Sequence, residues 1–295
     1  MERDRVELVL ARFAPQTRVV RITTLQGGVS SLMTLVEVDT PDLPSRLVLR
    51  RLGEHAREHD PESLRREQVV LGHARASGVP VPPILFSDLD GEVLGEPLLV
   101  LEYLEGEVAG RVSDPERFAR DVADAMATIH RIDTSGWGLD SSGPVRAPFP
   151  EPGRPVLERA YAALTPHLET FASTTLLHGD MWPGNLLVRD GRLVGILDWE
   201  DARLGDPLID IAIARLDLAW LYGEGSAEAF VDRMREHRDV PTHELALADL
   251  YACLRPGPHL DEWASAYPKI GRPDVTAASM REVQDRFAEQ ALARL

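Results

Sequence analysis

The chain has 295 residues, enough to bury a sizeable core as one large domain or two lobes. Its net charge of −16 excludes the basic footprint of a nucleic-acid-binding protein, and no apolar run is long enough to span a bilayer. A single cysteine, Cys253, excludes an internal disulfide framework, and the amino terminus is charged at once, without the apolar core of a signal peptide. These features predict a soluble, cytoplasmic protein.

The first hundred residues have mostly the pattern of strands. Apolar, β-like runs are separated by turn residues, with Asp90-Gly91 as a hairpin-like turn near their end. One segment, 63–76, has helical spacing and is closed by Ser77-Gly78. The strands expected here are two within 23–38, then 46–52, 83–88 and 97–104.

Beyond Gly106 the pattern becomes mainly helical. Amphipathic spacing predicts helices over 115–131, 211–222, 227–238, 244–254 and 277–295. Residues 134–155 hold four glycines and five prolines, and a structureless loop of that length is usually functional or mobile. A small β-rich lobe, residues 1–104, followed by a larger helical lobe, residues 105–295, is an α+β bilobal arrangement of the protein-kinase-like type.

Charged residues are distributed unevenly. Acidic residues exceed basic ones by 4 in residues 1–104 and by 12 in residues 105–295, which favours attraction of a cationic small molecule to the second part, although the excess also serves solubility. The basic residues are 31 arginines and one lysine, Lys269. Since no Gly-Lys-Ser/Thr follows a glycine-rich turn and no glycine triplet fits the dinucleotide fingerprint, P-loop and Rossmann sites are excluded.

The strongest local signal is a hairpin around Asp190-Gly191. Apolar runs flank this dipeptide, which predicts a two-residue turn with Asn185 opposite Ile196. Asp198 then becomes a diagonal neighbour of Asn185, and oxygen ligands converging from both suit Mg²⁺. Asp180, just before the hairpin, is placed to meet an acceptor hydroxyl.

At this point a family resemblance appears. His178-Gly179-Asp180 followed by Asn185 is similar to the catalytic loop of the aminoglycoside phosphotransferase and choline kinase family, and Asp198-Trp199-Glu200 with the Gly205–Asp210 run resembles its second signature. The resemblance implies ATP and Mg²⁺ as cofactors, Asp180 as catalytic base, and Asn185 and Asp198 as metal ligands. It also implies that His178 and Asp210 support the catalytic loop.

The resemblance extends to a nucleotide-binding amino-terminal lobe. The segment 26–31 resembles the loop that covers the phosphates, and the residues implied there are Gly27, Gly28, Ser30 and Ser31. The strand that ends at Leu104 resembles the hinge between lobes, where the backbone of Glu102 and Leu104 would bind adenine.

Glu67 is a carboxylate on an apolar helix face, in one stripe with Leu64, Leu71 and Ala74. Such a group needs a partner, and Arg50, at the place of the kinase strand lysine, is the expected one. A Glu67–Arg50 pair would resemble the ion pair that orients ATP phosphates, whereas the plain alternative is a glutamate that reaches solvent.

Other interpretations remain open. His55-Ala56-Arg57-Glu58-His59 matches a zinc-peptidase pattern but requires a firm helix and a distant third ligand. A catalytically inactive nucleotide-binding regulator on the same fold is a second alternative. For an active kinase, the small-molecule hydroxyl acceptor is an aminoglycoside, a macrolide, a choline-like alcohol, homoserine or a ketosamine, and the oligomeric state is unknown.

Overall fold

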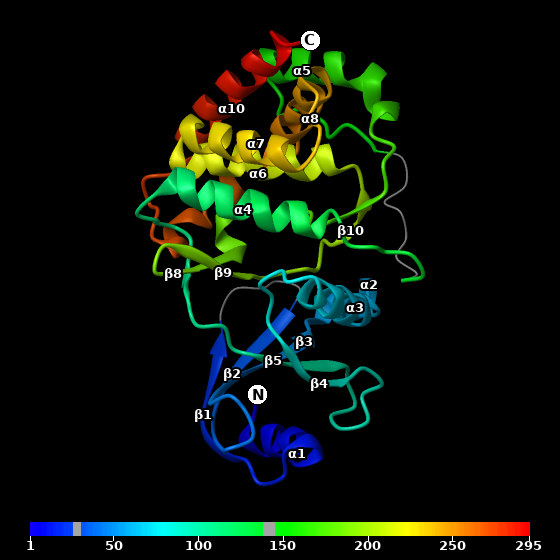
Figure 1. Ribbon diagram of the computed structural model, residues 1–295, viewed down its shortest axis with the longest axis vertical. Coiled ribbons are helices and arrows are strands. Elements are labelled where there is room, and N and C mark those ends of the chain that lie inside the picture. The colour runs from blue at the N-terminus through cyan, green and yellow to red at the C-terminus, as the bar shows by residue number, and fades with distance from the viewer. Residues whose placement is uncertain (26–30, 138–144) are drawn as a thin grey trace. The chain divides into compact units, whose positions relative to one another are not determined.

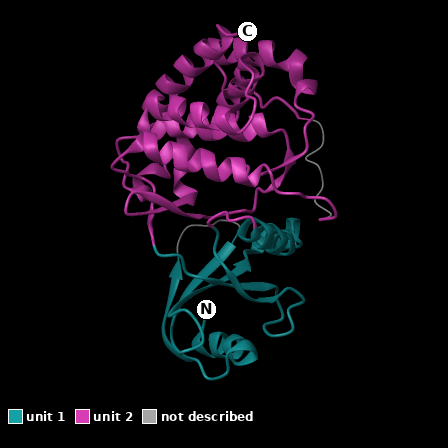
Figure 2. Ribbon diagram, viewed as in Figure 1, with its two compact units in different colours: residues 1–76, 81–105 teal, residues 77–80, 106–295 magenta. Residues whose placement is uncertain are grey.

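The computed structural model describes residues 1–25, 31–137 and 145–295. The chain divides into two compact units, coloured separately in Figure 2: Met1–Ala76 with Val81–Glu105, and Ser77–Pro80 with Gly106–Leu295. The main division thus falls between Glu105 and Gly106, one residue from the boundary that the sequence suggested. None of the helices among the described residues is long and apolar enough to cross a membrane.

The first unit contains a five-stranded antiparallel sheet of order β1-β2-β3-β5-β4 (Figure 1). Five strands were expected from the apolar runs of the sequence, but β1 begins at Arg18, five residues before the start of the predicted range. Their bounds are β1 Arg18–Leu25, β2 Ser31–Asp39, β3 Arg46–Leu52, β4 Ile84–Asp88 and β5 Leu98–Glu102.

Successive residues of a strand face opposite sides of the sheet, so residues of β3 with different parity meet different helices. Leu47 and Leu49 of β3 pack in one apolar cluster with α1 (Arg3–Phe13). Arg50 carries the opposite parity and meets α3 (Ser63–Ala76), whose bounds match the predicted helix. Neither α1 nor the short α2 (Glu54–His59) was expected from the sequence.

The second unit contains two small antiparallel sheets below a helical layer. One has the order β6-β8-β9 and the other pairs β10 with β7. The bounds of these strands are β6 Glu107–Val108, β7 Thr175–Leu177, β8 Leu186–Arg189, β9 Arg192–Ile196 and β10 Arg203–Gly205.

The β8–β9 hairpin corrects one expectation. Asp190 and Gly191 both have positive φ, 52° and 71°, as a tight two-residue turn of this kind requires, so the predicted turn is confirmed. The register is not, because a bulge between Leu187 and Val188 shifts the pairing by one residue. Ile196 therefore pairs with Leu186 and not with Asn185, whose carbonyl instead accepts from the Leu197 N–H at 2.8 Å.

Helices make up most of the second unit. The helix α6 is mostly apolar and buried on all sides, and it packs against α7 and α8, while α4 packs on α7 and α10 on α8 (Figure 1). Five of these helices were predicted with slightly different ends, and α5 and α9 were missed. The bounds are α4 Pro115–Ile129, α5 Pro155–Leu164, α6 Pro207–Tyr222, α7 Glu224–His237, α8 Thr242–Leu254, α9 Leu260–Ala264 and α10 Ala277–Leu292, with short 3₁₀ turns at Thr165–Thr170, Pro183–Asn185, Gly257–His259 and Tyr267–Ile270.

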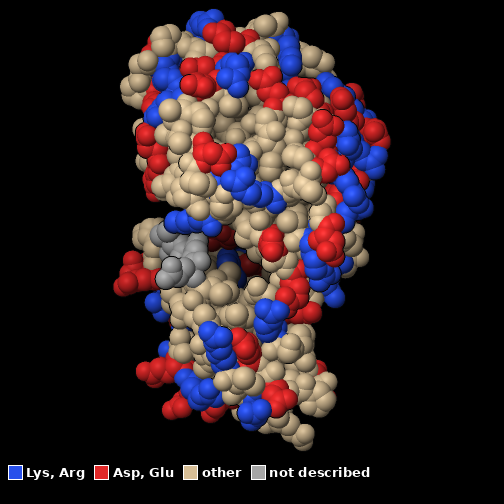
Figure 3. Space-filling model, turned by 90° about the vertical axis from the view of Figure 1, so that its left-hand side faces the viewer, with Lys and Arg blue, Asp and Glu red and all other residues tan. Residues whose placement is uncertain are grey.

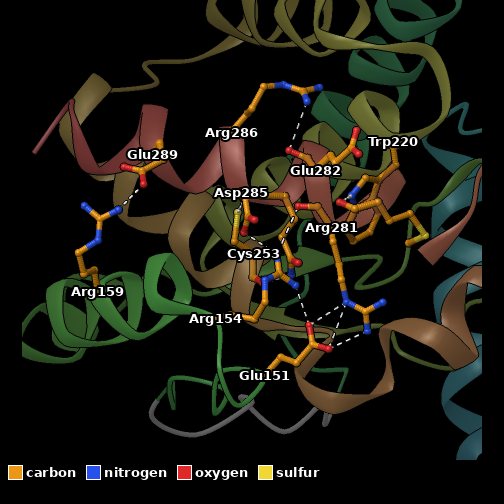
Figure 4. A network of polar contacts seen from close by, with 12 residues as sticks. Glu151, Arg154, Arg159, Trp220, Cys253, Arg281, Glu282, Asp285, Arg286 and Glu289 are labelled. Atoms are coloured by element: carbon orange, nitrogen blue, oxygen red, sulfur yellow. Dashed lines mark hydrogen bonds and ion pairs between the residues drawn. The ribbon is translucent and has the colours of Figure 1, made fainter. Parts of the chain in front are cut away.

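Ion pairs fasten the end of the glycine- and proline-rich segment to α10. Glu151 accepts from Arg154 and Arg281, and Arg154 also donates to Asp285 (Figure 4). Over the face shown in Figure 3, acidic and basic side chains are interspersed without forming a patch of one sign. The described part of the segment that follows residue 144 is thus held in place by specific charge pairs.

Candidate active site

A buried carboxylate fixes the backbone between β7 and the 3₁₀ turn Pro183–Asn185. Asp210, in the first turn of α6, is 1% exposed and accepts hydrogen bonds from the backbone N–H groups of His178, at 3.1 Å, and Gly179, at 2.9 Å. His130 Nε2, from the end of α4, lies 3.2 Å from the same carboxylate. Although burial raises the pKa of Asp210, these donors outweigh burial and leave the pKa below its usual value, so the group is ionised.

His178 is completely buried and holds two backbone groups. Its Nε2 lies 3.0 Å from the Leu197 carbonyl, and its Nδ1 accepts from the Asp180 N–H at 3.3 Å. Burial lowers the pKa of the imidazole, so the ring is neutral at pH 7 with its proton on Nε2. His178 therefore joins the segment before Asp198 to the loop that carries Asp180, without itself facing a cavity.

Asp180 and Asn185 are brought together by this loop. Asn185 Nδ2 donates to the Asp180 carbonyl at 2.9 Å and to its Oδ2 at 3.1 Å. The tight path depends on Gly179, which has φ +84° and whose Cβ, if present, would meet the Asp201 carbonyl at 2.7 Å. The loop thus presents the Asp180 carboxylate in a defined orientation.

Asp198 follows β9 in the left-handed region, with φ 61°, which is uncommon for a residue other than glycine. Backbone strain of this kind is concentrated at functional sites and is consistent with a constrained ligand. Asn185 uses its amide nitrogen for Asp180, so its Oδ1 is the atom available to a cation. An amide and a carboxylate oxygen form a hard donor set of the type that Mg²⁺ prefers.

A cavity of about 330 Å³ opens beside Asp180 within the second unit. It is lined by mainly charged and aromatic side chains from the loop that carries Asp180, from the segment between β9 and β10, from α6, and from the segment that follows α8. These residues are Asp180, Trp182, Asp201, Asp217, Arg255, Trp263, Ala266 and Tyr267. None of the described residues of 134–155 lines this cavity.

Arg255 is the residue of this cavity that sequence reasoning missed most completely. Its Nη2 donates to Asp180 Oδ1 at 2.9 Å and to the Gly179 carbonyl at 3.3 Å. Its guanidinium also lies 5.0 Å from the centre of the Trp263 ring, within range of a cation–π contact. Arg255 directly follows α8 and belongs to no motif, so only the packing of α8 against α6 brings it to the loop.

Two further aspartates, Asp201 and Asp217, line the cavity and were also missed. Asp217 is 5% exposed, and its Oδ2 has no hydrogen-bond partner among the described residues. Burial raises its pKa to about 8, and the nearby Asp180 adds to this rise while Arg255 opposes it. Burial and the charge of Asp180 also raise the pKa of Asp201.

The first unit contains the expected arginine–glutamate pair. Arg50 Nε donates to Glu67 Oε2 at 2.6 Å, and the two side chains are only 4% and 6% exposed. A glutamate on the apolar face of α3 is therefore balanced inside the unit and does not reach solvent.

Two of the remaining nucleotide-site candidates, Ser31 and Glu102, are on strand ends. Ser31 is the buried first residue of β2, and Glu102, the last residue of β5, donates its N–H to the Pro83 carbonyl at 2.9 Å. Leu104 lies two residues beyond that strand. Gly27, Gly28 and Ser30 lie outside the described residues.

The zinc-peptidase interpretation lacks a third ligand in the described part of the chain. His55 and His59 stack at 4.1 Å on the short α2, but no group of three or more His, Cys, Asp or Glu side chains is arranged there to hold a metal ion. We therefore set this interpretation aside.

Comparison with known proteins places this geometry in context. Residues 21–255 match the model of the phosphotransferase enzyme family. Among curated proteins, the mouse acyl-CoA dehydrogenase family member 10 is 27% identical over 242 residues, which cover 74% of this chain but only 22% of that protein. The chain thus spans about a fifth of the length of this relative.

Solved structures show the fold. A macrolide 2′-phosphotransferase from Brachybacterium faecium has a TM-score of 0.61 at 20% identity and covers 94% of this chain and 98% of its own. The choline kinase LicA from Streptococcus pneumoniae has a TM-score of 0.61 at 16% identity and covers 98% of both chains. The α+β, protein-kinase-like fold predicted from the sequence is confirmed.

Proposed function

The chain belongs to the phosphotransferase enzyme family, and from this premise we propose that it transfers the γ-phosphoryl group of ATP to a hydroxyl group of a small molecule. The observation that carries the proposal is the loop held by Asp210, which directs the Asp180 carboxylate into a cavity within hydrogen-bond reach of Asn185. Phosphoryl transfer needs mainly positioning and charge neutralisation, and this arrangement is rigid and charged.

Asp180 is the proposed catalytic base. Its carboxylate would accept the proton of the acceptor hydroxyl as that oxygen attacks phosphorus. Asn185 and Arg255 each occupy one carboxylate oxygen, through contacts of 3.1 and 2.9 Å, and so fix the plane of the group. Such fixed orientation is a large part of what an enzyme contributes to a transfer reaction.

Asn185 and Asp198 are the proposed ligands of Mg²⁺. When bound, the cation would neutralise charge on the nucleotide phosphates. In the first unit, Arg50 is the proposed phosphate-binding residue, and the ion pair with Glu67 orients its guanidinium group. Arginine differs from lysine here because its planar fork can contact a carboxylate and a phosphate oxygen together.

The acceptor has two candidate origins in the comparisons. The names of the related structures favour a macrolide-like or choline-like alcohol. The name of the curated relative favours a hydroxyl carried on an acyl thioester, since in that protein the matched region is part of a much longer chain named for acyl-CoA oxidation. A cytoplasmic location is proposed from the composition alone.

Formation of ADP from Mg-ATP with a panel of alcohols, amino alcohols, sugars and hydroxyacyl thioesters tests the proposal. Acceptor-dependent ADP formation that stops when EDTA removes the metal is the expected result. The opposite result would be that the wild type binds nucleotide but forms ADP no faster than the Asp180→Asn variant with every acceptor. The chain would then be a nucleotide-binding regulator.

A further inference from the structure

The cavity beside Asp180 at first suggests a site for a cation. Three aromatic side chains, Trp182, Trp263 and Tyr267, line it together with three carboxylates. Aromatic faces and acidic groups are the usual partners of an ammonium ligand. The acidic excess of residues 105–295 led to the same expectation from the sequence.

The chain, however, supplies its own cation to this cavity. Arg255 lies over the Trp263 ring at 5.0 Å and pairs with Asp180 at 2.9 Å, so it already occupies the positions that an ammonium group would take. The rings of Trp182 and Tyr267 meet edge to face at 5.7 Å. Asp180 and Arg255 therefore cancel one another's charge at the point where the acceptor hydroxyl must bind.

Asp217 is the second unusual group. It comes from the middle of α6, is 5% exposed and lines the cavity, and its buried Oδ2 atom lacks a partner among the described residues. A buried polar atom without a partner is costly, and here a bound ligand can supply one. The charged and titratable groups that face it are Arg255, Asp180 and Tyr267.

The charge state of Asp217 decides which ligand fits. Its pKa of about 8 leaves the carboxyl mostly protonated at pH 7, so that it donates a hydrogen bond and carries no charge. Arg255 uses only Nη2 for its hydrogen bonds to the described residues, which leaves Nε and Nη1 as further donors. The cavity thus offers hydrogen-bond donors from Asp217 and Arg255 to a ligand oxygen, next to Asp180, whose charge is balanced by Arg255.

We propose that Asp217 is a specificity-determining residue which, as an uncharged carboxyl group, binds an oxygen of an uncharged acceptor next to the hydroxyl that is phosphorylated. This inference rests on the proposed function and replaces the cationic acceptor expected from net charge. Acceptors of this class are polyols, sugars and hydroxyacyl compounds, and the volume of about 330 Å³ is at the lower end of ligand sites.

Matched pairs of acceptors test the proposal directly. Glucose is compared with glucosamine, and ethylene glycol with ethanolamine, so that an ammonium group replaces one hydroxyl. We expect a higher kcat/KM for the uncharged member of each pair. Asp217→Asn, which still donates a hydrogen bond, keeps this preference, whereas Asp217→Leu raises KM for the uncharged member by about tenfold, as expected for one lost hydrogen bond to a buried group. Asp232→Asn is the control, because it makes the same Asp-to-Asn change at an exposed site on α7, and it should leave kcat/KM and KM unaltered.

Calorimetric binding of the same pairs separates this inference from the proposed function. Binding of the uncharged member without any turnover supports the role of Asp217 while contradicting the kinase proposal. Preference for the ammonium member, unchanged constants in Asp217→Leu, or no binding of an uncharged member in either assay would overturn the role of Asp217. Acceptor affinity should also fall as the pH rises through about 8 in the wild type but not in Asp217→Asn.

Discussion

The helix α6 holds two buried aspartates, Asp210 and Asp217, and their pKa values are shifted in opposite directions. Asp210, in the first turn, is 1% exposed, yet its pKa lies below the usual value. Asp217, two turns later on the same helix, is 5% exposed, and its pKa rises to about 8. Burial alone therefore does not decide the charge of a carboxyl group in this protein.

Hydrogen-bond donors make the difference. Asp210 receives two backbone N–H groups and lies beside His130, all of which favour the ionised form. Asp217 faces a cavity, with one oxygen unpartnered among the described residues, so desolvation prevails. The ionised Asp210 holds the loop that carries Asp180, and the uncharged Asp217 lines the cavity beside that loop, which is the arrangement expected of a support and a proposed ligand-binding residue.

The largest expected effect concerns Asp180, the proposed catalytic base. Asp180→Asn should leave ATP binding nearly intact and lower kcat by about 10²–10⁴-fold, because the amide cannot accept the hydroxyl proton. Steady-state kinetics with the best acceptor of the panel, together with nucleotide titration, measure the two effects separately. Wild-type turnover in this variant would remove Asp180 from the mechanism.

Asp210→Asn should come next in size. The amide keeps one acceptor oxygen but places N–H groups against backbone donors, so we expect a loss of about 1.5–3 kcal/mol in stability and a reduced kcat as the loop shifts. Urea unfolding and kcat measure the two losses. The control is Asp249→Asn, another buried aspartate, paired with Arg215 away from the loop, which should lose stability without a matching loss of kcat. Equal kinetic defects in both variants would make the role of Asp210 merely structural.

The buried Glu67 gives a third case, a carboxylate balanced by an arginine. Arg50→Ala should raise KM for ATP and lower kcat, Glu67→Ala should show a milder defect, and the double variant should be less impaired than the two losses added together. Partial activity in Arg50→Lys would indicate that charge matters more than the planar fork. Arg51→Ala is the control, because the neighbouring Arg51 pairs with Glu96 instead. Unaltered ATP kinetics in Arg50→Ala would show that the pair has no role in nucleotide binding.

The smallest expected effect is a change in how stability depends on pH. In the unfolded chain Asp217 ionises near pH 3.9, roughly, whereas in the folded chain it keeps its proton to about 8. The folded state thus binds the extra proton, and its stability falls as the pH rises between these values. Asp217→Asn removes this loss, so relative to the wild type the variant should gain stability between pH 5 and pH 8, roughly. Urea unfolding measures this change. If the stability difference between the variant and the wild type is the same at both pH values, Asp217 is ionised in the folded protein.

Asp210 carries the opposite dependence. Because its folded pKa is lowered, its contribution to stability is present above the unfolded value and is lost as acid protonates it. The two buried aspartates of α6 therefore make opposite contributions to the pH dependence of unfolding.

Much of the fold was predictable because its signals are local. The helix over 63–76, the strand 46–52 and the Asp190-Gly191 turn depend on spacing and turn chemistry within a few residues. The helix α1 was not predicted, although the sequence contains a signal for it: Val6, Val9, Leu10 and Phe13 recur at helical spacing. The hairpin register was wrong because a bulge leaves no clear mark in an apolar run.

The candidate site divides in the same way. Residues of the two signatures, such as Asp180 and Asn185 in the first and Asp210 in the second, were singled out from the sequence. In the structure Asn185 contacts Asp180, and Asp210 accepts from the backbone of His178. Asp217 lies on α6 and Arg255 directly follows α8, both outside the two signatures, and nothing in their neighbours' identities marks them. Only tertiary packing places them beside Asp180, and so the residues that would select the acceptor are those that sequence cannot reveal.

The central claim is that the chain moves a phosphoryl group from ATP to a hydroxyl. The most direct measurement is mass spectrometry of the acceptor panel after incubation with Mg-ATP and the purified chain. We predict that one acceptor gains the mass of a phosphoryl group in step with ADP formation, and that Asp180→Asn yields almost none of this product. ADP formed with inorganic phosphate alone, and no phosphorylated acceptor in the panel, would contradict the account.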